Sequence, residues 1–183
     1  MCAETTDESL MLQYAAGDAA AFETLYARHK APLYRYVLRQ VDNSIADEIF
    51  QDIWLKLIHA RDDYQPSAKF TTWLYRIAHN RIIDFYRRQS IRPVDSNAAA
   101  IETTAERDCD QPEQRFESQD RIERLLSAIT DLPREQKDAF LLREQAGLSL
   151  GEIAELTGVS FEAAKSRLRY AIQRLRRALE GTT

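Results

Sequence analysis

The stretch that decides the fold is residues 149–168, SLGEIAELTGVSFEAAKSRL. Ser149 and Glu152 have the spacing of a capping box, which predicts the start of a short helix. Gly158 fits the tight turn that ends this helix, and Ser160 can cap a second one. Together these signals predict a helix-turn-helix unit, in which the second helix enters the major groove of DNA.

The second helix of this unit has a one-sided basic face. From Ala163 to Arg177 the chain carries six basic residues and no acidic one. A solvated helix packed on a bundle is the alternative, but such a helix would not need this asymmetry of charge. The pattern therefore favours contact with DNA phosphates and base edges. The outward positions are Glu162, Lys165, Ser166, Arg169 and Gln173.

A second informative stretch is residues 71–80, TTWLYRIAHN, which runs on to Asp84, Arg87 and Arg88. Aromatic side chains interleaved with arginine suit a single strand whose bases are unstacked. An exposed asparagine such as Asn80 can read a base edge through paired hydrogen bonds. Trp73 and Phe85 fit the hydrophobic core at least as well.

A third stretch is residues 47–57, DEIFQDIWLKL, where carboxylates lie beside large apolar side chains. Metal binding by Asp47, Glu48 and Asp52 is the alternative interpretation. It is disfavoured because no histidine is near and no glycine-containing acidic loop is present. A polar rim around apolar groups is typical of a protein interface, so we expect a docking surface here.

The hydrophobic periodicity predicts an all-α protein of two small helical domains. In the first, one helix starts near Ser9 and breaks at Gly17-Asp18, and a second opens near Pro32. Two more helices follow over 45–60 and 71–89, with a polar loop over 62–68 between them. Periodicity is lost over 91–118 and resumes from 119. We therefore assign residues 1–90 and 119–183 to the domains and 91–118 to a flexible acidic linker.

Composition excludes several functional classes. The net charge is −4, but residues 91–118 hold seven acidic and three basic residues, so the acidity is concentrated in the linker. The scattered cysteines and histidines predict no metal site and no disulfide framework. No phosphate-binding glycine loop or hydrolase motif occurs, so we expect no catalysis, cofactor or small-molecule substrate. An acidic N-terminus and no long apolar run predict a cytoplasmic protein without membrane insertion.

Taken in order, these stretches resemble the extracytoplasmic-function sigma factors of the sigma-70 family. Residues 47–57 resemble its polymerase-binding helix and residues 72–84 its −10-reading helix. Five short motifs resemble its region 4: Leu132-Pro133, Leu142-Arg143-Glu144, Gly147-Leu148-Ser149, Glu152-Ile153-Ala154 and Ser166-Arg167-Leu168. The resemblance covers about residues 9–89 and 119–180, with Phe50 and His79 departing from the family pattern.

The resemblance implies partners and residue roles. The implied partners are core RNA polymerase, through its β′ clamp helices and β flap, promoter DNA, and an anti-sigma factor. Residues implied in polymerase binding are Asp47, Glu48, Gln51, Asp52, Trp54 and Leu55. Residues implied at the −10 element are Tyr64, Lys69, Phe70, Thr72, Arg76, Asn80, Asp84, Arg87 and Arg88. Residues implied at the −35 element are Ser160, Glu162, Lys165, Ser166, Arg167, Arg169, Tyr170 and Arg174.

The expected function is therefore a transcription initiation factor with a region 2 bundle and a region 4 helix-turn-helix. One alternative is a stand-alone helix-turn-helix regulator whose N-terminal domain senses a ligand or dimerises. A second is an enzyme on nucleic acid, such as a recombinase, for which no nucleophile is apparent. For an initiation factor, we expect the free chain to bind promoter DNA weakly.

Overall fold

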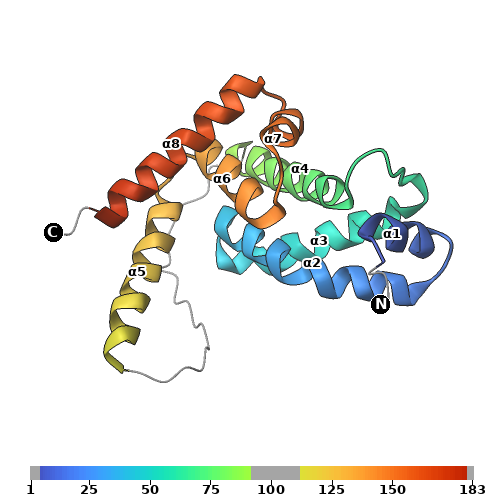
Figure 1. Ribbon diagram of the computed structural model, residues 1–183. Coiled ribbons are helices and arrows are strands. Elements are labelled where there is room, and N and C mark those ends of the chain that lie inside the picture. Colours follow the sequence, from blue (N-terminus) through green and yellow to red (C-terminus); the bar gives the residue numbers. More distant parts are fainter. Residues whose placement is uncertain (1–4, 92–111, 181–183) are drawn as a thin grey trace.

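The computed structural model describes residues 5–91 and 112–180, with side chains over 5–90 and 120–180. Every regular element within these residues is a helix, which confirms the all-α prediction (Figure 1). The elements are α1 (Asp7–Ala15), α2 (Ala19–Gln40), α3 (Asn43–His59), the 3-10 helix η1 (Arg61–Asp63), α4 (Phe70–Ile91), α5 (Pro112–Thr130), α6 (Arg134–Ala146), α7 (Leu150–Thr157) and α8 (Phe161–Glu180). No helix in the described ranges has the length and apolar character needed to cross a membrane.

The first domain packs α1 to α4 around one core. On α3 the four-residue recurrence of Ile49, Ile53 and Leu57 places all three side chains in the interior, fully buried. The break predicted at Gly17-Asp18 inside the first helix is present, and it separates α1 from α2. Gly17 has a φ of 105°, and Asp18 caps α2 by accepting a hydrogen bond from the Ala20 backbone N–H at 3.0 Å.

Pro32 lies inside α2, so the prediction that a new helix begins there was wrong. Proline lacks an N–H, and in a helix interior it costs about 3 kcal/mol. The helix continues because Leu25, Leu33 and Tyr36, on both sides of the proline, are fully buried in the core. Burying such side chains contributes about 1.5–3 kcal/mol each, which offsets the local cost.

The segment 91–118 is only partly what we expected. Residues 92–111 lie outside the described residues, and so does most of the predicted flexible linker. α4 extends to Ile91, and α5 begins at Pro112, within the segment expected to be linker. Proline suits a first helical position because its φ is already helical and its missing N–H needs no partner there.

The second domain consists of α5 to α8, and its helix ends follow the predicted signals. Ser149 and Glu152 form both hydrogen bonds of the capping box at the start of α7. Gly158 ends α7 in the left-handed conformation, with a φ of 69°. The Ala163 N–H donates to Ser160 Oγ at 3.2 Å, which caps α8. The helix-turn-helix prediction is thereby confirmed, with α7 and α8 as its two helices.

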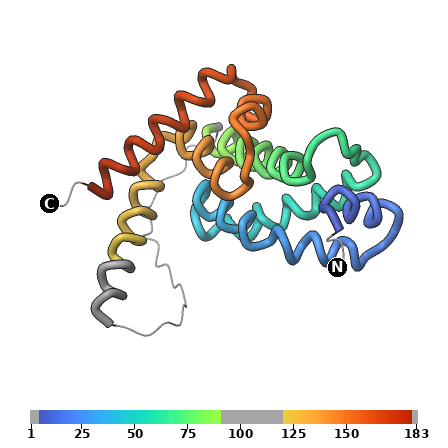
Figure 2. Tube along the Cα trace, viewed as in Figure 1, coloured from blue at the N-terminus to red at the C-terminus, as the bar shows by residue number. Residues whose placement is uncertain are grey.

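The two domains contact each other. α6 lies against α2 and α4, and α7 lies against α4. α8 crosses α6 and packs along α5, so the C-terminal helix points away from the first domain (Figure 2). The helix-turn-helix therefore presents α7 to the first domain and leaves much of α8 at the surface.

Candidate nucleic-acid and partner interfaces

The acidic surface of α3 is exposed and held in place by neighbouring side chains. Asp47, Glu48, Gln51 and Leu55 are exposed, as a docking surface requires, and Leu55 retains 51% of its accessible area. The Tyr34 hydroxyl donates to Asp47 Oδ1 at 2.7 Å, and this hydrogen bond raises the pKa of Tyr34. The carboxylate of Asp47 is therefore fixed in orientation on an otherwise open surface.

Arg81 is a structural residue that the sequence did not reveal. Its side chain on α4 is 9% exposed and lies 2.6 Å from Asp52 Oδ2 and 3.7 Å from Glu48 Oε1. One carboxylate expected to face polymerase thus pairs with a buried guanidinium of the same domain. The side chain of Asp52 is still 38% exposed. It can therefore pair with Arg81 inside the domain and also present an oxygen at the surface.

Trp54 lies in the core and not on the docking surface. It is 5% exposed, and its ring packs against Phe22, Tyr26 and Phe50 at centroid distances of 5.8, 4.9 and 6.3 Å. Its buried indole N–H has no hydrogen-bond partner among the described residues. In this conformation the ring is therefore a core side chain, and its direct contact with a partner stays a prediction.

α4 presents a basic surface that includes most of the predicted −10 residues. Arg76, Asn80, Arg87 and Arg88 are exposed, and Asp84 is half-exposed. The Asp84 carboxylate lies 4.0 Å from Lys56 Nζ on α3. This arrangement places an amide that can read a base edge between cations that can bind phosphates.

Three other predicted −10 residues are buried. Tyr64 is 6% exposed, Phe70 is fully buried and Thr72 is 4% exposed. Tyr64 packs on Trp73 at a centroid distance of 4.9 Å, so these rings form the base of the loop before α4. Because these three side chains are covered in this conformation, their direct contact with a base stays a prediction. Of the loop candidates Tyr64, Lys69 and Phe70, Lys69 alone is exposed.

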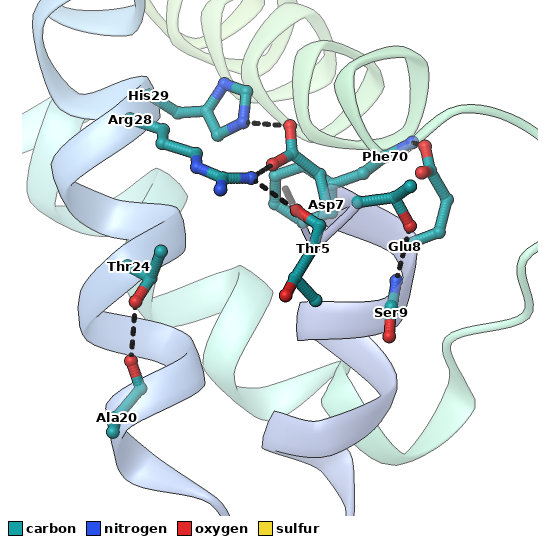
Figure 3. Close-up of polar contacts among 10 residues, drawn as sticks. Thr5, Asp7, Glu8, Ser9, Ala20, Thr24, Arg28, His29 and Phe70 are labelled. Carbon is teal, nitrogen blue, oxygen red and sulfur yellow. Dashed lines mark hydrogen bonds and ion pairs between the residues drawn. The ribbon is translucent and has the colours of Figure 1, made fainter. Parts of the chain in front are cut away.

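This loop is anchored by acidic residues of α1, which the sequence gave no reason to select. Asp7 binds Arg28 Nη1 at 2.7 Å and His29 Nε2 at 2.6 Å, which ties α1 to α2 (Figure 3). Glu8 Oε1 accepts a hydrogen bond from the Phe70 backbone N–H at 2.8 Å (Figure 3). A carboxylate is favourable there because the first turn of a helix has unpaired N–H groups and a partial positive charge.

The acidic pair also affects Tyr64. Burial, and then the nearby charges of Glu8 and Asp7, raises the pKa of Tyr64 to about 12. Its buried hydroxyl has no hydrogen-bond partner among the described side chains. Tyr64 therefore stays neutral at physiological pH, because a phenolate would be repelled by the two nearby carboxylates.

The outer face of α8 is the second basic surface. Six predicted −35 residues have exposed or partly exposed side chains: Glu162, Lys165, Ser166, Arg169, Tyr170 and Arg174. Ser160 is exposed but acts as the helix cap. Arg167 turns toward α6, where its guanidinium lies 2.7 Å from Glu135 Oε2, and its assignment to the DNA face stays a prediction.

The contact between the domains contains a buried carboxylate. Asp138 of α6 is 8% exposed, and its Oδ1 accepts hydrogen bonds from Tyr36 Oη and Gln40 Nε2, both at 2.8 Å. His79 Nδ1 lies 3.0 Å from Asp138 Oδ2. Burial and the neighbouring Asp138 raise the pKa of Tyr36 well above its ordinary value. Nothing in the local sequence around Asp138 pointed to this role.

Metal binding finds no support in the described ranges. Over residues 5–91 and 112–180, no three side chains of His, Cys, Asp or Glu gather as metal ligands would. The carboxylates of α3 are directed instead to Tyr34 and Arg81.

Comparison with known proteins connects both domains to one family. Residues 25–91 match the model of sigma-70 region 2, and residues 122–179 match that of sigma-70 region 4. The chain is 30% identical over 174 residues to the ECF RNA polymerase sigma-E factor of Escherichia coli K12, covering 92% of this chain and 91% of that protein. The sigma-E factor of Haemophilus influenzae is 29% identical over the same length.

Two solved structures resemble the whole chain. The structure of CnrH in complex with the cytosolic domain of CnrY has a TM-score of 0.68 at 26% identity, covering 97% of this chain and 99% of that one. The sigma factor RpoE of Bartonella quintana, solved with the anti-sigma factor NepR, has a TM-score of 0.70 at 20% identity. The latter covers 88% of this chain and 98% of RpoE, and it is a likeness of fold.

Proposed function

This chain belongs to the extracytoplasmic-function sigma factors of the sigma-70 family, and we propose that its two domains divide promoter recognition between them. It is a promoter-directing transcription initiation factor. In the proposed division, α3 binds core RNA polymerase, α4 captures the −10 element and α8 reads the −35 element. We infer that the chain catalyses nothing itself and acts in the cytoplasm beside polymerase.

One observation carries this proposal: two separate basic helix surfaces, on α4 and α8, belong to domains that match region 2 and region 4 in the family's order. A stand-alone regulator needs only the second surface. It gives no reason for an exposed Asn80 between arginines on a different domain. The regulator with a sensing domain is therefore not favoured.

For polymerase binding, we propose the exposed part of the α3 surface, Asp47, Glu48, Gln51 and Leu55. A central apolar side chain within a polar rim is the usual anatomy of a protein interface. The β′ clamp helices of polymerase are the proposed partner. Asp52 would contribute its exposed oxygen while Arg81 holds its side chain in place.

For the −10 element, we propose that Asn80 holds an unstacked base and that Arg76, Arg87 and Arg88 contact the strand around it. Unstacking a base costs a few kcal/mol, which contacts in the protein and polymerase must return. Arginine side chains neutralise phosphates and release counterions, so this contact should weaken as salt rises. Lys69 at the end of the preceding loop would extend the same surface.

For the −35 element, we propose Lys165, Arg169, Tyr170 and Arg174 on α8. In helix-turn-helix proteins the early residues of the second helix reach base edges, while later cations bind phosphates. The first turn of α8, capped by Ser160, would therefore provide specificity, and Arg174 would provide affinity.

An anti-sigma factor is the third proposed partner. Of the solved structures that resemble this chain, RpoE was solved with the anti-sigma factor NepR, and CnrH was solved with the cytosolic domain of CnrY. A partner of this kind would be expected to cover the same surfaces that polymerase and DNA need.

The decisive test is run-off transcription. Core RNA polymerase from the source bacterium is mixed with this chain and with genomic fragments that carry candidate promoters. We expect discrete, chain-dependent transcripts, and none from core polymerase alone. Tight, sequence-specific binding of the chain to DNA without polymerase, together with no stimulation of transcription, would support the stand-alone regulator instead. A nucleic-acid-processing activity of the chain alone would support the enzyme alternative.

A further inference from the structure

The segment between α3 and α4, residues 60–69, is held at both ends by α1. At its start, the guanidinium carbon of Arg61 lies 5.5 Å from the centre of the Tyr14 ring. At its end, Glu8 Oε1 accepts a hydrogen bond of 2.8 Å from the backbone N–H of Phe70, the first residue of α4 (Figure 3). One short helix, α1, therefore contacts the segment where it leaves α3 and where it enters α4.

The middle of the segment is held less firmly. The side chains of residues 65–69 are exposed. The ion pair of Lys69 with Glu152 is long, at 3.9 Å, and the lysine side chain is largely exposed, so it contributes little. Tyr64 is buried, but its hydroxyl has no hydrogen-bond partner among the described side chains. The path of the exposed residues therefore depends on the contacts at the two ends.

α1 forms because of signals in its own first turn. Thr6 Oγ1 accepts a hydrogen bond from the Ser9 N–H at 3.3 Å, which caps the helix, and the acidic residues that follow are favourable there. A helix of nine residues is marginal by itself, so its position depends on packing. Three of its side chains are buried in the core: Leu10, Met11 and Tyr14.

Ion pairs then fix α1 on α2. Asp7 lies 2.7 Å from Arg28 Nη1 and 2.6 Å from His29 Nε2, and Arg28 also donates to the Thr5 carbonyl oxygen at 2.9 Å (Figure 3). The His29 ring in turn lies 5.1 Å from the Phe70 ring, measured between centroids. The carboxylate that accepts the Phe70 N–H is therefore carried by a helix that is itself attached to the core.

Glu8 acts on the protein and not on DNA. A carboxylate repels phosphates, so it is a poor contact for a DNA strand. It is favourable where it lies, because the first turn of α4 has unpaired N–H groups and a partial positive charge. Its charge also reaches the segment: burial, and then the charges of Glu8 and Asp7, raises the pKa of Tyr64 to about 12.

From these contacts we propose that Glu8 is a positioning residue for −10 recognition: it fixes the start of α4 and the exposed residues 65–69 before the DNA strand arrives. The inference rests on the function proposed above, because it concerns the same surface around Asn80. A surface already held in its binding geometry loses less conformational freedom on binding, so it holds the correct base more tightly. Loss of the Glu8 contact should lower selectivity at the −10 element and leave the α3 and α8 surfaces unchanged.

The first experiment measures hydrogen–deuterium exchange of the free chain in peptides that cover residues 60–72. Glu8→Ala removes the acceptor of the Phe70 N–H, so exchange there should become faster by about tenfold, the effect of losing one hydrogen bond to a charged group. Glu8→Gln keeps a side-chain oxygen that can accept this N–H and should exchange at nearly the parent rate. Unchanged exchange in Glu8→Ala, or an increase spread evenly over the first domain, would overturn the proposal.

Two further variants complete this experiment. Glu23→Ala removes a carboxylate at an exposed position of α2 and is the matched control, which should exchange like the parent. Arg61→Gln removes the contact at the start of the segment. Because the Arg61 side chain is 44% exposed, this variant tests the role of α1 even if Glu8→Ala impairs folding. It should speed exchange in the same peptides, and parent-like exchange would count against the proposal.

The second experiment measures selectivity with core RNA polymerase. The probe is a promoter that the parent chain transcribes in the run-off assay, together with copies that carry single base changes in the −10 or the −35 element. Glu8→Ala should reduce discrimination against the −10 changes by about tenfold, keep discrimination against the −35 changes, and be rescued in Glu8→Gln. A merely structural role would lower transcription from all promoters by one factor. That result, or equal effects of Glu8→Ala and Glu8→Gln, would contradict positioning through the hydrogen bond.

The two proposals fail differently. Absence of promoter-directed transcription by the parent chain removes the proposed function, and the role of Glu8 with it. Normal transcription by the parent chain, together with unchanged −10 discrimination in Glu8→Ala, removes only the positioning role.

Discussion

Asn80 provides the sharpest test at the level of single residues, because its amide is exposed on α4 in the basic surface. Asn80→Ala should reduce promoter melting by about 5- to 150-fold, since a paired amide contact to a base contributes about 1–3 kcal/mol. Permanganate reactivity of promoter thymines in the polymerase complex measures the melting. Gln89→Ala, which removes another exposed amide of the same helix, is the control and should have little effect. Equal loss of polymerase binding in Asn80→Ala would argue against the assigned role.

Arg81 provides a test of stability. Arg81→Met leaves the half-exposed Asp52 without its cation and should lower the free energy of unfolding by about 1–3 kcal/mol. Urea denaturation followed by circular dichroism measures this change. Lys56→Met is the matched control, because Lys56 and Asp84 are 4.0 Å apart and both about half-exposed. It should change stability by less than about 1 kcal/mol. Similar losses of unfolding free energy in the two variants would show that the buried Arg81 ion pair stabilises the fold no more than the exposed Lys56 pair does.

Single residues also show where sequence reasoning reaches its limit. Exposed candidates such as Asn80 and Arg169 could be predicted, because helical periodicity separates the outer face from the core. Asp138 could not, since its partners Tyr36 and Gln40 lie 102 and 98 residues away in the chain. The burial of Trp54 was not predicted for a related reason: a large ring next to carboxylates fits a docking surface and an aromatic core equally well until its neighbours are known.

At the level of elements, the turn of the helix-turn-helix can be tested with two glycines of opposite expectation. Gly158 has a φ of 69° and an added Cβ would meet nothing within 4 Å, so Gly158→Ala carries only backbone strain, about 1 kcal/mol. Gly151 lies within α7, and Gly151→Ala should raise stability by up to about 1 kcal/mol through helix propensity. Thermal denaturation measures both changes: the melting temperature should fall in Gly158→Ala and rise in Gly151→Ala. A stabilised Gly158→Ala would show that the turn does not need the left-handed conformation.

The start of α7 predicts a dependence on pH. Hydrogen bonds from Ser149 lower the pKa of the Glu152 carboxyl in the folded chain. Its stabilising contribution is therefore complete above the ordinary glutamate pKa and is lost as the pH falls through the lowered folded value. The stability advantage of the parent chain over Glu152→Gln should thus shrink on acidification. Urea titrations of both chains at neutral and acidic pH measure this difference in the free energy of unfolding. A difference that does not change with pH would show that the charge of Glu152 does not contribute to stability.

Some helix boundaries are determined by nearby residues in the sequence, and others depend on packing in the folded chain. The caps at Ser149 and Ser160 follow from side chains a few residues away, so the sequence was sufficient. Pro32 was misread because burial of the whole α2 face outweighs one missing hydrogen bond. The start of α5 at Pro112 was missed because polar composition hid a helix that begins with proline.

At the level of the whole molecule, the charge distribution and the contacts between α4 and α7 lead to the same expectation. The net negative charge lies mainly in residues 91–118, while each domain carries a basic helix surface. On α4, Arg76 pairs with Glu155 of α7, and Thr72 donates a hydrogen bond to Glu152. The free protein should therefore have weak affinity for promoter fragments, and core polymerase should raise it sharply. Gel-shift titrations with and without core polymerase measure this, and tight specific binding by the chain alone would contradict it.

The location of the aromatic core on α3 and at the start of α4 has an optical consequence. Both tryptophans of the chain, Trp54 and Trp73, belong to the first domain, so tryptophan emission reports on that domain alone. Ellipticity, in contrast, reports on helices of both domains. If the contacts of Asp138 with Tyr36, Gln40 and His79 couple the domains, thermal curves from the two signals should coincide in the parent chain and separate in Asp138→Ala. The intrinsic emission of the protein thus allows the coupling of its domains to be followed without any attached label.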